Sequence, residues 1–570
     1  MTKYLALLCL LFGWLAPLHI LPWISWHNEV WSFVAVILLA WSGLCTLIKK
    51  KDFRALGLPI ATLPLLALGV IAAIQTAAGL INFAGDALVI GFYSALCVIC
   101  MSLGFAYQTR TVPVRAGFKT SGGSQGNTDV LLLAYVLLIG AFISTVLAFA
   151  QIFDLWTGTS WIARMPALRR PGGNLGQPNQ MASLLLMGIA SLLFLYESHK
   201  LTALPATLLL FILCLGLAVT ESRTGILSFC VMVLWFFAKR RAVGFRLSAW
   251  VVVLSMLCFF GLFWTWPALI NAIQLMSSGA TVSTQPGMRL IVWPQLLAAL
   301  ALRPWWGWGI GRISDAHNAV VDAYPVSEPF TYSHNILLDL GLGVGVPVAA
   351  LVVLLGAVWL WRRLSSTQQL LPWYCLAVAL PLAVHSMLEF PFAYAYFLVP
   401  VMFLLGGLEG ALAPNGFVRI GWWPVAMGLF LVTVTMGWSV VEYIAIEEDF
   451  RVARFEAMHI GRTPNSYKRP KIILLTQLGA LLEGSRTVPA PGMSSERIDL
   501  ARKLALHFPT PALQNRYALS LALNGNLEEA MRQLKVMRAM HGEKAYQDIK
   551  ANWSQLADTR YAQLQLLKIP

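Results

Sequence analysis

The side chains of this chain that could do chemistry are few, and most of them stand next to long apolar runs. They come from five separate segments, and they are Gln177 and Asn179, Arg223, Arg289, His334, and finally His385, Glu389, Tyr394 and Tyr396. A histidine can remove a proton from a hydroxyl near neutral pH, and an arginine keeps its charge when partly desolvated and pairs with phosphate. With a carboxylate beside them, these residue types suit group transfer from a phosphate-bearing donor.

The histidine at position 334 illustrates the placement. Tyr332, Ser333, His334 and Asn335 open an apolar run that continues to about residue 361. A polar group there costs free energy if it faces lipid, so we expect the start of this apolar run to face other polar segments. The glycines of GLGVGVP (341–347) are expected to allow close helix packing.

Several of these residues also have a purely structural interpretation. Arg170 could contact lipid headgroups, and tyrosines near span ends, such as Tyr394 and Tyr396, are typical of an aromatic belt. Ser222 could cap the helix that follows it. We interpret His317 as a buried, hydrogen-bonded polar residue rather than a catalyst.

The elements that must position these residues are membrane helices. Of 570 residues, 58% are hydrophobic and only 12% are charged, and the mean hydropathy is +0.69. These values predict an all-α polytopic membrane protein. The net charge of +15 does not indicate nucleic-acid binding, because the basic residues stand in short loops between apolar runs. All eight cysteines fall inside apolar runs, without metal-site or disulfide spacing.

Apolar runs long enough to cross a bilayer predict about thirteen spans. They are 4–21, 29–47, 55–76, 84–107, 129–151, 180–196, 201–219, 223–238, 247–267, 334–361, 370–386, 392–411 and 421–440. We interpret the first as an anchor rather than a cleaved signal peptide. The prediction is a transmembrane catalytic domain over 1–440, whose large loop at 268–333 carries an amphipathic helix, and a helical domain over 441–570.

The basic residues also predict an orientation. Most lysines and arginines before residue 440 fall in alternate loops, which indicates a cytoplasmic N-terminus. An odd number of spans then places the chemistry-bearing segments and the tail on the outer side. In the tail, two helices are expected around Asn524-Gly525-Asn526. GNLEEA is similar to the turn of a tetratricopeptide repeat, although a generic helical hairpin fits equally well.

Three motifs resemble one known family. YSHNILLDLGLGVGVP (332–347) looks like the signature of the O-antigen ligase and polymerase superfamily. GGNLGQPNQMA (172–182) and HSMLEFPFAYAYF (385–397) are similar to those of bacterial protein O-oligosaccharyltransferases that glycosylate pilins. The resemblance implies a multi-pass protein of the bacterial inner membrane, with its active site and tail in the periplasm. It implies a glycan donor on undecaprenyl pyrophosphate and a Ser or Thr acceptor on a secreted protein, above all a pilin, with no metal and no cofactor.

The resemblance also implies roles for single residues. His334 matches the family histidine that acts as base or orients the acceptor hydroxyl. His385 and Glu389, which match an HSxxExP element, are the other two candidate catalytic residues. Arg223 and Arg289 match arginines that hold the pyrophosphate. The other donor-side candidates are Gln177, Asn179, Arg170, and either Tyr394 or Tyr396.

Other functions remain open from the sequence. One is an O-antigen ligase that transfers to a lipid A core sugar, and a close variant is a lipid-linked polysaccharide polymerase. A third, which is not an enzyme, is a flippase or transporter of a lipid-linked glycan. Transporters place their polar residues near the membrane midplane, whereas here they gather at one face.

Overall fold

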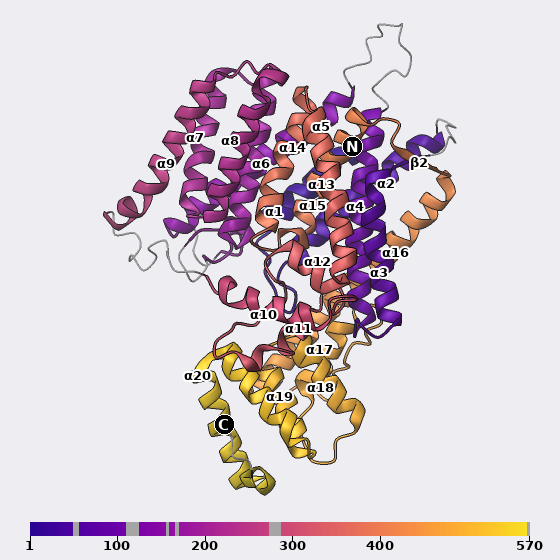
Figure 1. Cartoon of the computed structure of the whole chain (residues 1–570), viewed down its shortest axis with the longest axis vertical. Coiled ribbons are helices and arrows are strands. Elements are labelled where there is room, and N and C mark those ends of the chain that lie inside the picture. The colour runs from indigo at the N-terminus through magenta and orange to yellow at the C-terminus, as the bar shows by residue number, and fades with distance from the viewer. Residues whose placement is uncertain (50–55, 110–124, 156–158, 166–169, 273–286, 567–570) are drawn as a thin grey trace. The chain divides into compact units, whose positions relative to one another are not determined.

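The computed structural model describes residues 1–49, 56–109, 125–155, 159–165, 170–272 and 287–566. Within these residues the chain forms twenty α-helices, short 3₁₀ turns and one two-stranded sheet (Figure 1). The prediction of an all-α polytopic membrane protein is confirmed. Part of the predicted large loop, at 273–286, lies outside the described residues.

The first ten helices are α1 Thr2–Leu15, α2 Trp26–Lys49, α3 Leu63–Ala77, α4 Ala84–Thr109, α5 Gln125–Ile152, α6 Pro178–Glu197, α7 Ala203–Val219, α8 Arg223–Val243, α9 Ala249–Ala272 and α10 Arg289–Leu302. The remaining ones are α11 Ile313–Asn318, α12 Ile336–Val344, α13 Val346–Ser366, α14 Leu370–Ser386, α15 Ala395–Leu412, α16 Trp422–Ala457, α17 Thr476–Arg486, α18 Ser495–His507, α19 Pro511–Leu523 and α20 Leu527–Thr559. Strands β1 Leu56–Pro59 and β2 Phe417–Ile420 pair antiparallel.

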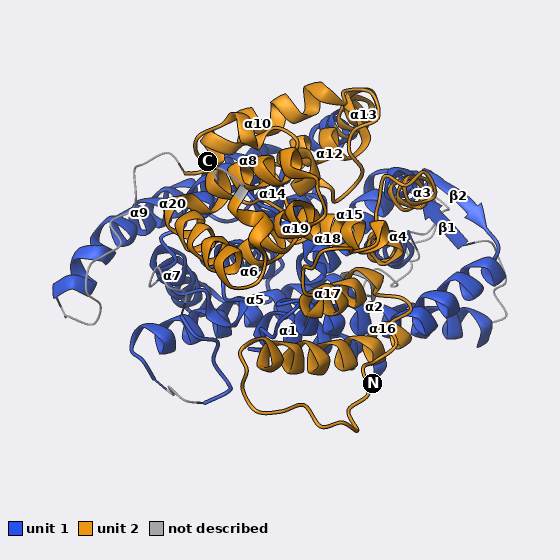
Figure 2. Ribbon diagram, turned by 90° about the horizontal axis from the view of Figure 1, so that it is seen from below, with its two compact units in different colours: residues 1–67, 92–284, 357–436 blue, residues 68–91, 285–356, 437–570 orange. Residues whose placement is uncertain are grey.

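The chain divides into two compact units (Figure 2). Unit 1 comprises residues 1–67, 92–284 and 357–436, and unit 2 comprises residues 68–91, 285–356 and 437–570. Each unit gathers segments that are far apart in the sequence. The expected division into domains 1–440 and 441–570, which concerns the membrane, stays a prediction.

Each of the thirteen predicted spans coincides with at least one helix. Nine of the helical segments in the described part of the chain are long and apolar enough to cross a membrane, and α1, α7 and α14 are shorter apolar helices. The number of spans therefore stays a prediction, while the multi-pass character of the chain does not depend on it.

The tenth predicted span is not one continuous helix. It is interrupted at Gly345, which separates α12 from α13 and has a φ of +81°. A Cβ at this glycine would meet the Trp305 carbonyl oxygen at 2.2 Å. The Val346 N–H instead donates to the Pro304 carbonyl at 2.7 Å. The small residues thus allow the backbone before and after them to pack directly on the non-helical segment at 304–308.

Helix α6 is the centre of the packing in unit 1. Of its span, 83% is buried, and it packs on α5, α7, α8 and α14 (Figure 1). A helix that is apolar all round is expected to be enclosed in this way. Helix α7 runs back between α6 and α8, so that α6 and α8 both start at the end of the helix bundle where α14 ends. The polar residues at these three helix ends are therefore brought together.

In unit 2, helices α10 to α12 share a small core of their own. Its buried residues are Val292, Leu296, Ala299, Ile313, Ala316, Phe330 and Leu342. The opposite side of α10 leaves Leu290 and Leu297 largely exposed, at 59% and 56%. An exposed apolar face beside a polar helix start fits the surface helix that the sequence predicts around Arg289.

The tail forms helices α17 to α20, and its core includes the fully buried Trp553. The expected helical pair around Asn524-Gly525-Asn526 is present as α19 and α20. Helix α20 breaks at Gly542, which has a φ of +81°. Similarity to a tetratricopeptide repeat stays a prediction.

Helix α20 is tied to helix α11 of the loop. Arg532 donates to the Asn318 carbonyl and side-chain oxygens, both at 2.9 Å, and Gln533 exchanges hydrogen bonds with the same amide. Val321 packs into an apolar cluster with three residues of α20. The Ser327 N–H donates to the Ala539 carbonyl at 2.8 Å. The tail therefore supports the loop through both polar and apolar contacts.

His317 lies in the middle of this support and is fully buried. Its Nε2 is 2.8 Å from the Gln295 side-chain oxygen and 2.9 Å from the Ser327 hydroxyl. These contacts agree with its interpretation as a buried, hydrogen-bonded polar residue.

We expect Gly345→Ala to lower the free energy of unfolding. The backbone conformation of Gly345, with φ +81° and ψ 161°, alone costs a residue with a Cβ about 1–3 kcal/mol, and the contact with Trp305 adds to it. Gly356→Ala is the matched control, because nothing lies within 4 Å of its added Cβ and alanine favours a helix. Thermal unfolding of the detergent-solubilised protein measures both variants. Equal melting temperatures would contradict the close approach at Gly345.

We also expect a pH dependence of stability from His317, because burial lowers its pKa from 6.5 to about 4. The fold favours the neutral imidazole, whereas the unfolded chain binds a proton below pH 6.5. This contribution is complete above pH 6.5 and is lost as the pH falls to about 4, by roughly 3 kcal/mol. His317→Gln should flatten that slope in denaturation curves, and an unchanged slope would show that His317 is not its source.

Candidate active site

A buried carboxylate, Glu389, is the centre of the polar cluster in unit 1 and is only 5% exposed. Asn179 Nδ2 donates to its Oε1 at 2.6 Å, and Gln177 Nε2 donates to its Oε2 at 3.1 Å. His385 Nε2 lies 3.0 Å from the same Oε2. Four of the residues singled out in the sequence are thus brought into direct contact.

The local sequence explains these positions. Pro178 starts α6, so Gln177 takes an extended conformation just before the helix and Asn179 lies in its first turn. His385 ends α14, and the following turn brings Glu389 beneath it, because the Glu389 N–H donates to the His385 carbonyl at 2.8 Å. Ser183, one turn into α6, has its hydroxyl 2.8 Å from His385 Nδ1. Both ring nitrogens of His385 therefore have partners.

Ser222 joins this cluster to the start of α8. Its hydroxyl oxygen accepts the Gly225 N–H at 2.9 Å, so it caps the helix as the sequence allowed. The same hydroxyl donates to Asn179 Oδ1 at 2.6 Å. Arg223, the first residue of α8, consequently follows a residue that is bonded to Asn179, which is itself a partner of Glu389.

Arg170 belongs to the same region. Its Nε donates to the Thr220 carbonyl at 2.9 Å, and the charges of Glu221, Glu389 and Arg223 all act on it. Burial is the main cause that lowers the pKa of Arg170, and burial also raises the pKa of Glu221. Because Arg170 is bound by protein groups, its interpretation as a residue that only contacts lipid headgroups is weakened.

The two candidate tyrosines lie side by side, with ring centroids 5.2 Å apart. The Tyr396 hydroxyl donates to Gln180 Oε1 at 2.8 Å, and Tyr396 is almost fully buried. Tyr394 is half-buried and therefore the more accessible of the two. Glu29 supports this segment by accepting the Ala395 N–H at 2.9 Å. The structure describes both side chains but leaves the choice between them a prediction.

His334 and Arg289 belong to unit 2. His334 is half-buried, has a φ of +61° and packs its ring on Phe330, with centroids 4.7 Å apart. Asn335, next to it, caps α12 by accepting the Leu337 N–H at 3.0 Å. The local turn thus presents the histidine just before a capped helix, in a backbone conformation that is uncommon for a non-glycine residue.

Arg289 is the first residue of α10, one turn before Trp293. The Trp293 indole N–H donates to the Ser333 carbonyl at 2.7 Å. The start of α10 is therefore fastened to the residue that precedes His334.

Some residues of the cluster were not predicted. They are Ser183, Gln180 and Glu29, and a second contact of Ser222. Helical spacing offered one signal, because Asn179 and Ser183 are four residues apart and face the same side of α6. Nothing in the sequence near Glu29 connects it with residue 395.

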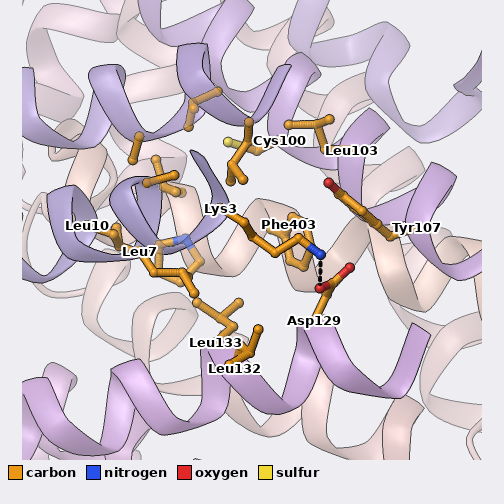
Figure 3. A pocket seen from close by; sticks show the side chains of 16 residues that line it. Lys3, Leu7, Leu10, Cys100, Leu103, Tyr107, Asp129, Leu132, Leu133 and Phe403 are labelled. Carbon is orange, nitrogen blue, oxygen red and sulfur yellow. Dashed lines mark hydrogen bonds and ion pairs between the residues drawn. The ribbon is translucent and has the colours of Figure 1, made fainter. Parts of the chain in front are cut away.

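An apolar hollow also occurs in unit 1, but it does not resemble a reactive site. It has a volume of about 50 Å³ and lies among α1, α2, α4, α5 and α15 (Figure 3). Lys3 and Asp129 form an ion pair at its edge. Among the described residues, no group of three or more His, Cys, Asp or Glu side chains could hold a metal ion.

The chain matches three protein families in successive segments. Residues 171–196 match the family described as Protein glycosylation ligase, and residues 208–353 match O-Antigen ligase. Residues 373–556 match Virulence factor membrane-bound polymerase, C-terminal. The first segment contains Gln177 and Asn179, and the second contains His334.

Two proteins of Acinetobacter baylyi are similar to this chain. A General O-oligosaccharyltransferase is 24% identical over 545 residues, which cover 93% of this chain and 90% of that relative. A ComP-specific O-oligosaccharyltransferase is 28% identical over 286 residues, which cover 48% of this chain and 50% of that relative. With the family matches, these similarities confirm the resemblance to protein O-oligosaccharyltransferases of the O-antigen ligase and polymerase superfamily, and they show that the chain is a glycosyltransferase.

Proposed function

We propose that the chain transfers a glycan in one step from undecaprenyl pyrophosphate to a Ser or Thr hydroxyl of an exported protein, most simply a pilin. The observation that carries the proposal is the convergence of Gln177, Asn179 and His385 on the buried Glu389, with Arg170 in charge range. The names of both relatives, O-oligosaccharyltransferases, support transfer of a glycan to protein oxygen.

The proposed location is the periplasmic face of the bacterial inner membrane. The distribution of lysine and arginine supports a cytoplasmic N-terminus, and the helix ends that carry the polar cluster would then face the periplasm. There the enzyme meets both a membrane-anchored donor and an exported acceptor. A reporter fused after α16 tests this orientation, and a cytosolic location of the reporter would contradict it.

The arginines are assigned to the pyrophosphate. Arg223 and Arg289 would hold its charge, and Arg170 is a further arginine assigned to the donor. Guanidinium groups retain their proton when partly buried and form charge-assisted hydrogen bonds with phosphate oxygens. They would thus stabilise the negative charge that develops on the leaving group, which is where electrostatic catalysis is most effective.

His334 is assigned to the acceptor. Its imidazole takes the proton of the acceptor hydroxyl while the oxygen attacks the anomeric carbon. The bond from that carbon to the phosphate oxygen breaks, and the lipid pyrophosphate leaves with its electron pair. Because the leaving group is already good, orientation and charge stabilisation suffice. Direct attack inverts the anomeric carbon, and a product with retained configuration would exclude it.

Glu389 is assigned as the residue that orders the donor side. As an acceptor of hydrogen bonds from Gln177, Asn179 and His385, it fixes the rotamers of all three. It also offsets the charge of Arg170 before the pyrophosphate arrives. We regard it as a positioning residue, since its own oxygens are occupied by protein donors.

Transfer assays with purified protein and lipid-linked glycan test the function itself. Offered side by side, a pilin and a lipid A core acceptor separate a protein ligase from an O-antigen ligase, and chain growth without either acceptor would indicate a polymerase. Glycan movement across vesicles without any transfer would indicate a transporter. Mass spectrometry of exported proteins with and without this chain identifies the natural acceptors.

We expect His334→Ala to reduce transfer by at least about a hundredfold, the scale of a lost general base. His459→Ala is the matched control, because His459 also has a positive φ, of 56°, but is exposed in a turn. His334→Gly relieves the same backbone strain and should remain inactive. The measured quantity is the transfer rate of correctly folded protein. Near wild-type activity of His334→Ala would reduce this residue to a structural role.

We expect Glu389→Gln to reduce transfer roughly ten- to a hundredfold, as for other residues that orient reacting groups. The side-chain NH2 group of the new glutamine would face the N–H groups of Gln177 and Asn179, one of which then loses its acceptor. We therefore expect the effect chiefly as weaker use of the glycan donor. Glu409→Gln is the control, because Glu409 is equally buried but pairs with Arg363 at 2.6 Å. That variant should lose stability and keep the donor KM. Identical donor KM values for Glu389→Gln and wild type would remove the assignment.

A further inference from the structure

A cavity of unit 2 is rich in charge and contains none of the residues assigned to the reaction. Its volume is about 340 Å³, and it lies among the α3–α4 connection, the segment around α11 and helices α18 to α20. The charged residues that line it are Arg303, Arg312, Arg502, Arg532, Asp315 and Glu529. Four arginines face two carboxylates, so the walls favour a negatively charged ligand.

Arg312 is the unusual member of this set, because it is only 6% exposed and yet some of its N–H groups are not hydrogen-bonded. Its Nη2 donates to Asp315. Within the part of the chain that the structure describes, neither its Nε nor its Nη1 has a hydrogen-bond partner. Buried guanidinium donors are normally satisfied, and leaving them unmade is costly. The Nε and Nη1 groups of this buried cation could therefore donate to oxygen atoms of a ligand or of solvent.

The other arginines are largely engaged by the protein. Arg532 is held by Glu529, Asn318 and Asp322, and Arg502 is held by Asp499. These pairs cancel part of the positive charge. A dianionic phosphate would be repelled by Asp315 and Glu529, whereas a single carboxylate that bonds to Arg312 carries half the charge and meets less of this repulsion.

Arg303 and two aromatic residues complete the walls. The Arg303 guanidinium stacks on Trp308, 4.2 Å from the ring centroid, and Tyr517 contributes from α19. The walls also include the planar guanidinium of Arg303, the indole of Trp308 and the side-chain amides of Asn318 and Gln533. These groups suit a short polar peptide segment next to the ligand's carboxylate. The cavity is of the size that binds a side chain with its neighbouring backbone rather than a whole domain.

The position of the cavity indicates which partner would use it. In the described part of the chain, none of its lining residues lies in a helix that could span the membrane, and most of them belong to the loop and the tail. The same loop carries His334, whose ring packs on Phe330, and Phe330 shares a core with Ile313 and Ala316 beside Arg312. The cavity is thus built on the loop that we assign to the acceptor hydroxyl.

We propose that this cavity binds an acidic side chain of the acceptor protein, with its carboxylate on Arg312. The proposal rests on the proposed function, which makes the acceptor a protein. The tail then has a direct role in acceptor choice, because α18, α19 and α20 supply Arg502, Tyr517 and Arg532 to the walls. Binding of this kind weakens with rising ionic strength, since part of the attraction is electrostatic.

Binding of small probes tests the cavity without any transfer reaction. N-acetyl-aspartate N-methylamide and its asparagine counterpart are compared on the purified full chain by saturation-transfer NMR. We expect the aspartate probe alone to bind, and Arg312→Gln to weaken it roughly tenfold or more, the scale of a hydrogen bond to a charged group. Arg502→Gln, at a more exposed wall position, should weaken it if Arg312→Gln does not fold. Arg538→Gln, an exposed arginine of α20 outside the cavity, is the matched control and should bind as wild type.

Two results of this experiment would overturn the proposal. One is a lack of selectivity, seen as equal binding of the aspartate and asparagine probes or as equal binding of the aspartate probe by wild type and both cavity variants. The other is tighter binding of glucuronate than of the aspartate probe, with loss in the same variants, which would assign the cavity to an acidic sugar of the glycan.

A transfer assay supplies the second arm. Arg502→Gln should raise the KM for an acidic acceptor more than it lowers kcat, and it should leave the donor KM near that of wild type. A raised donor KM with an unchanged acceptor KM would contradict acceptor binding. If the wild-type chain transfers no glycan at all, the proposed function fails, but the probe experiment still decides whether the cavity selects carboxylates.

Discussion

The polar cluster of unit 1 is organised around a carboxylate that is almost fully buried. A buried Glu389 is tolerable only if its oxygens are hydrogen-bonded, because an isolated charge in an apolar interior is very costly. Helices α6 and α14 meet this requirement by directing amide and imidazole groups at it from their ends. The polar ends of these helices therefore cannot move apart without exposing an unsatisfied charge. This constraint keeps a set of otherwise adaptable side chains in one arrangement.

In unit 2, the main constraint is that the irregular loop between α9 and α12 must be held in a defined conformation. The break at Gly345 lets the segment at 304–308 bond directly to the backbone around it. Helix α20 then clamps α11 through Asn318 and packs on Val321. Through Ser327, His317 and Gln295 the support reaches α10, on which Arg289 stands. A residue on such a loop can be oriented as well as one on a helix, provided that every polar group finds a partner.

These two constructions fit a glycosyltransferase whose donor carries its own leaving group. The protein need not form a covalent intermediate or bind a metal in the scheme proposed here; it has to orient an alcohol and neutralise a departing anion. Arginine suits the second task because its charge survives burial, and histidine suits the first because it titrates near neutrality. In the proposed scheme, the tail and the loop would add a surface on which acceptors can differ without any change at the reacting atoms.

The class of the fold and most members of the cluster could be predicted from the sequence alone. Hydropathy placed a helix on every expected span, and the QPN and HSMLE motifs identified Gln177, Asn179, His385 and Glu389 at helix ends. The interruption at Gly345 was not foreseen, because an apolar run of sufficient length gives no sign of a contact with residues forty positions earlier.

Which polar groups become hydrogen-bond partners depends on the tertiary structure. The pairing of Ser183 with His385, the second bond of Ser222 and the support of residue 395 by Glu29 all join different helices. Periodicity shows which residues share one face of a helix, but the rotation and tilt of that helix against its neighbours depend on how all the side chains pack. The same reason hid the cavity at Arg312, whose walls come from three stretches of the chain that meet only after folding.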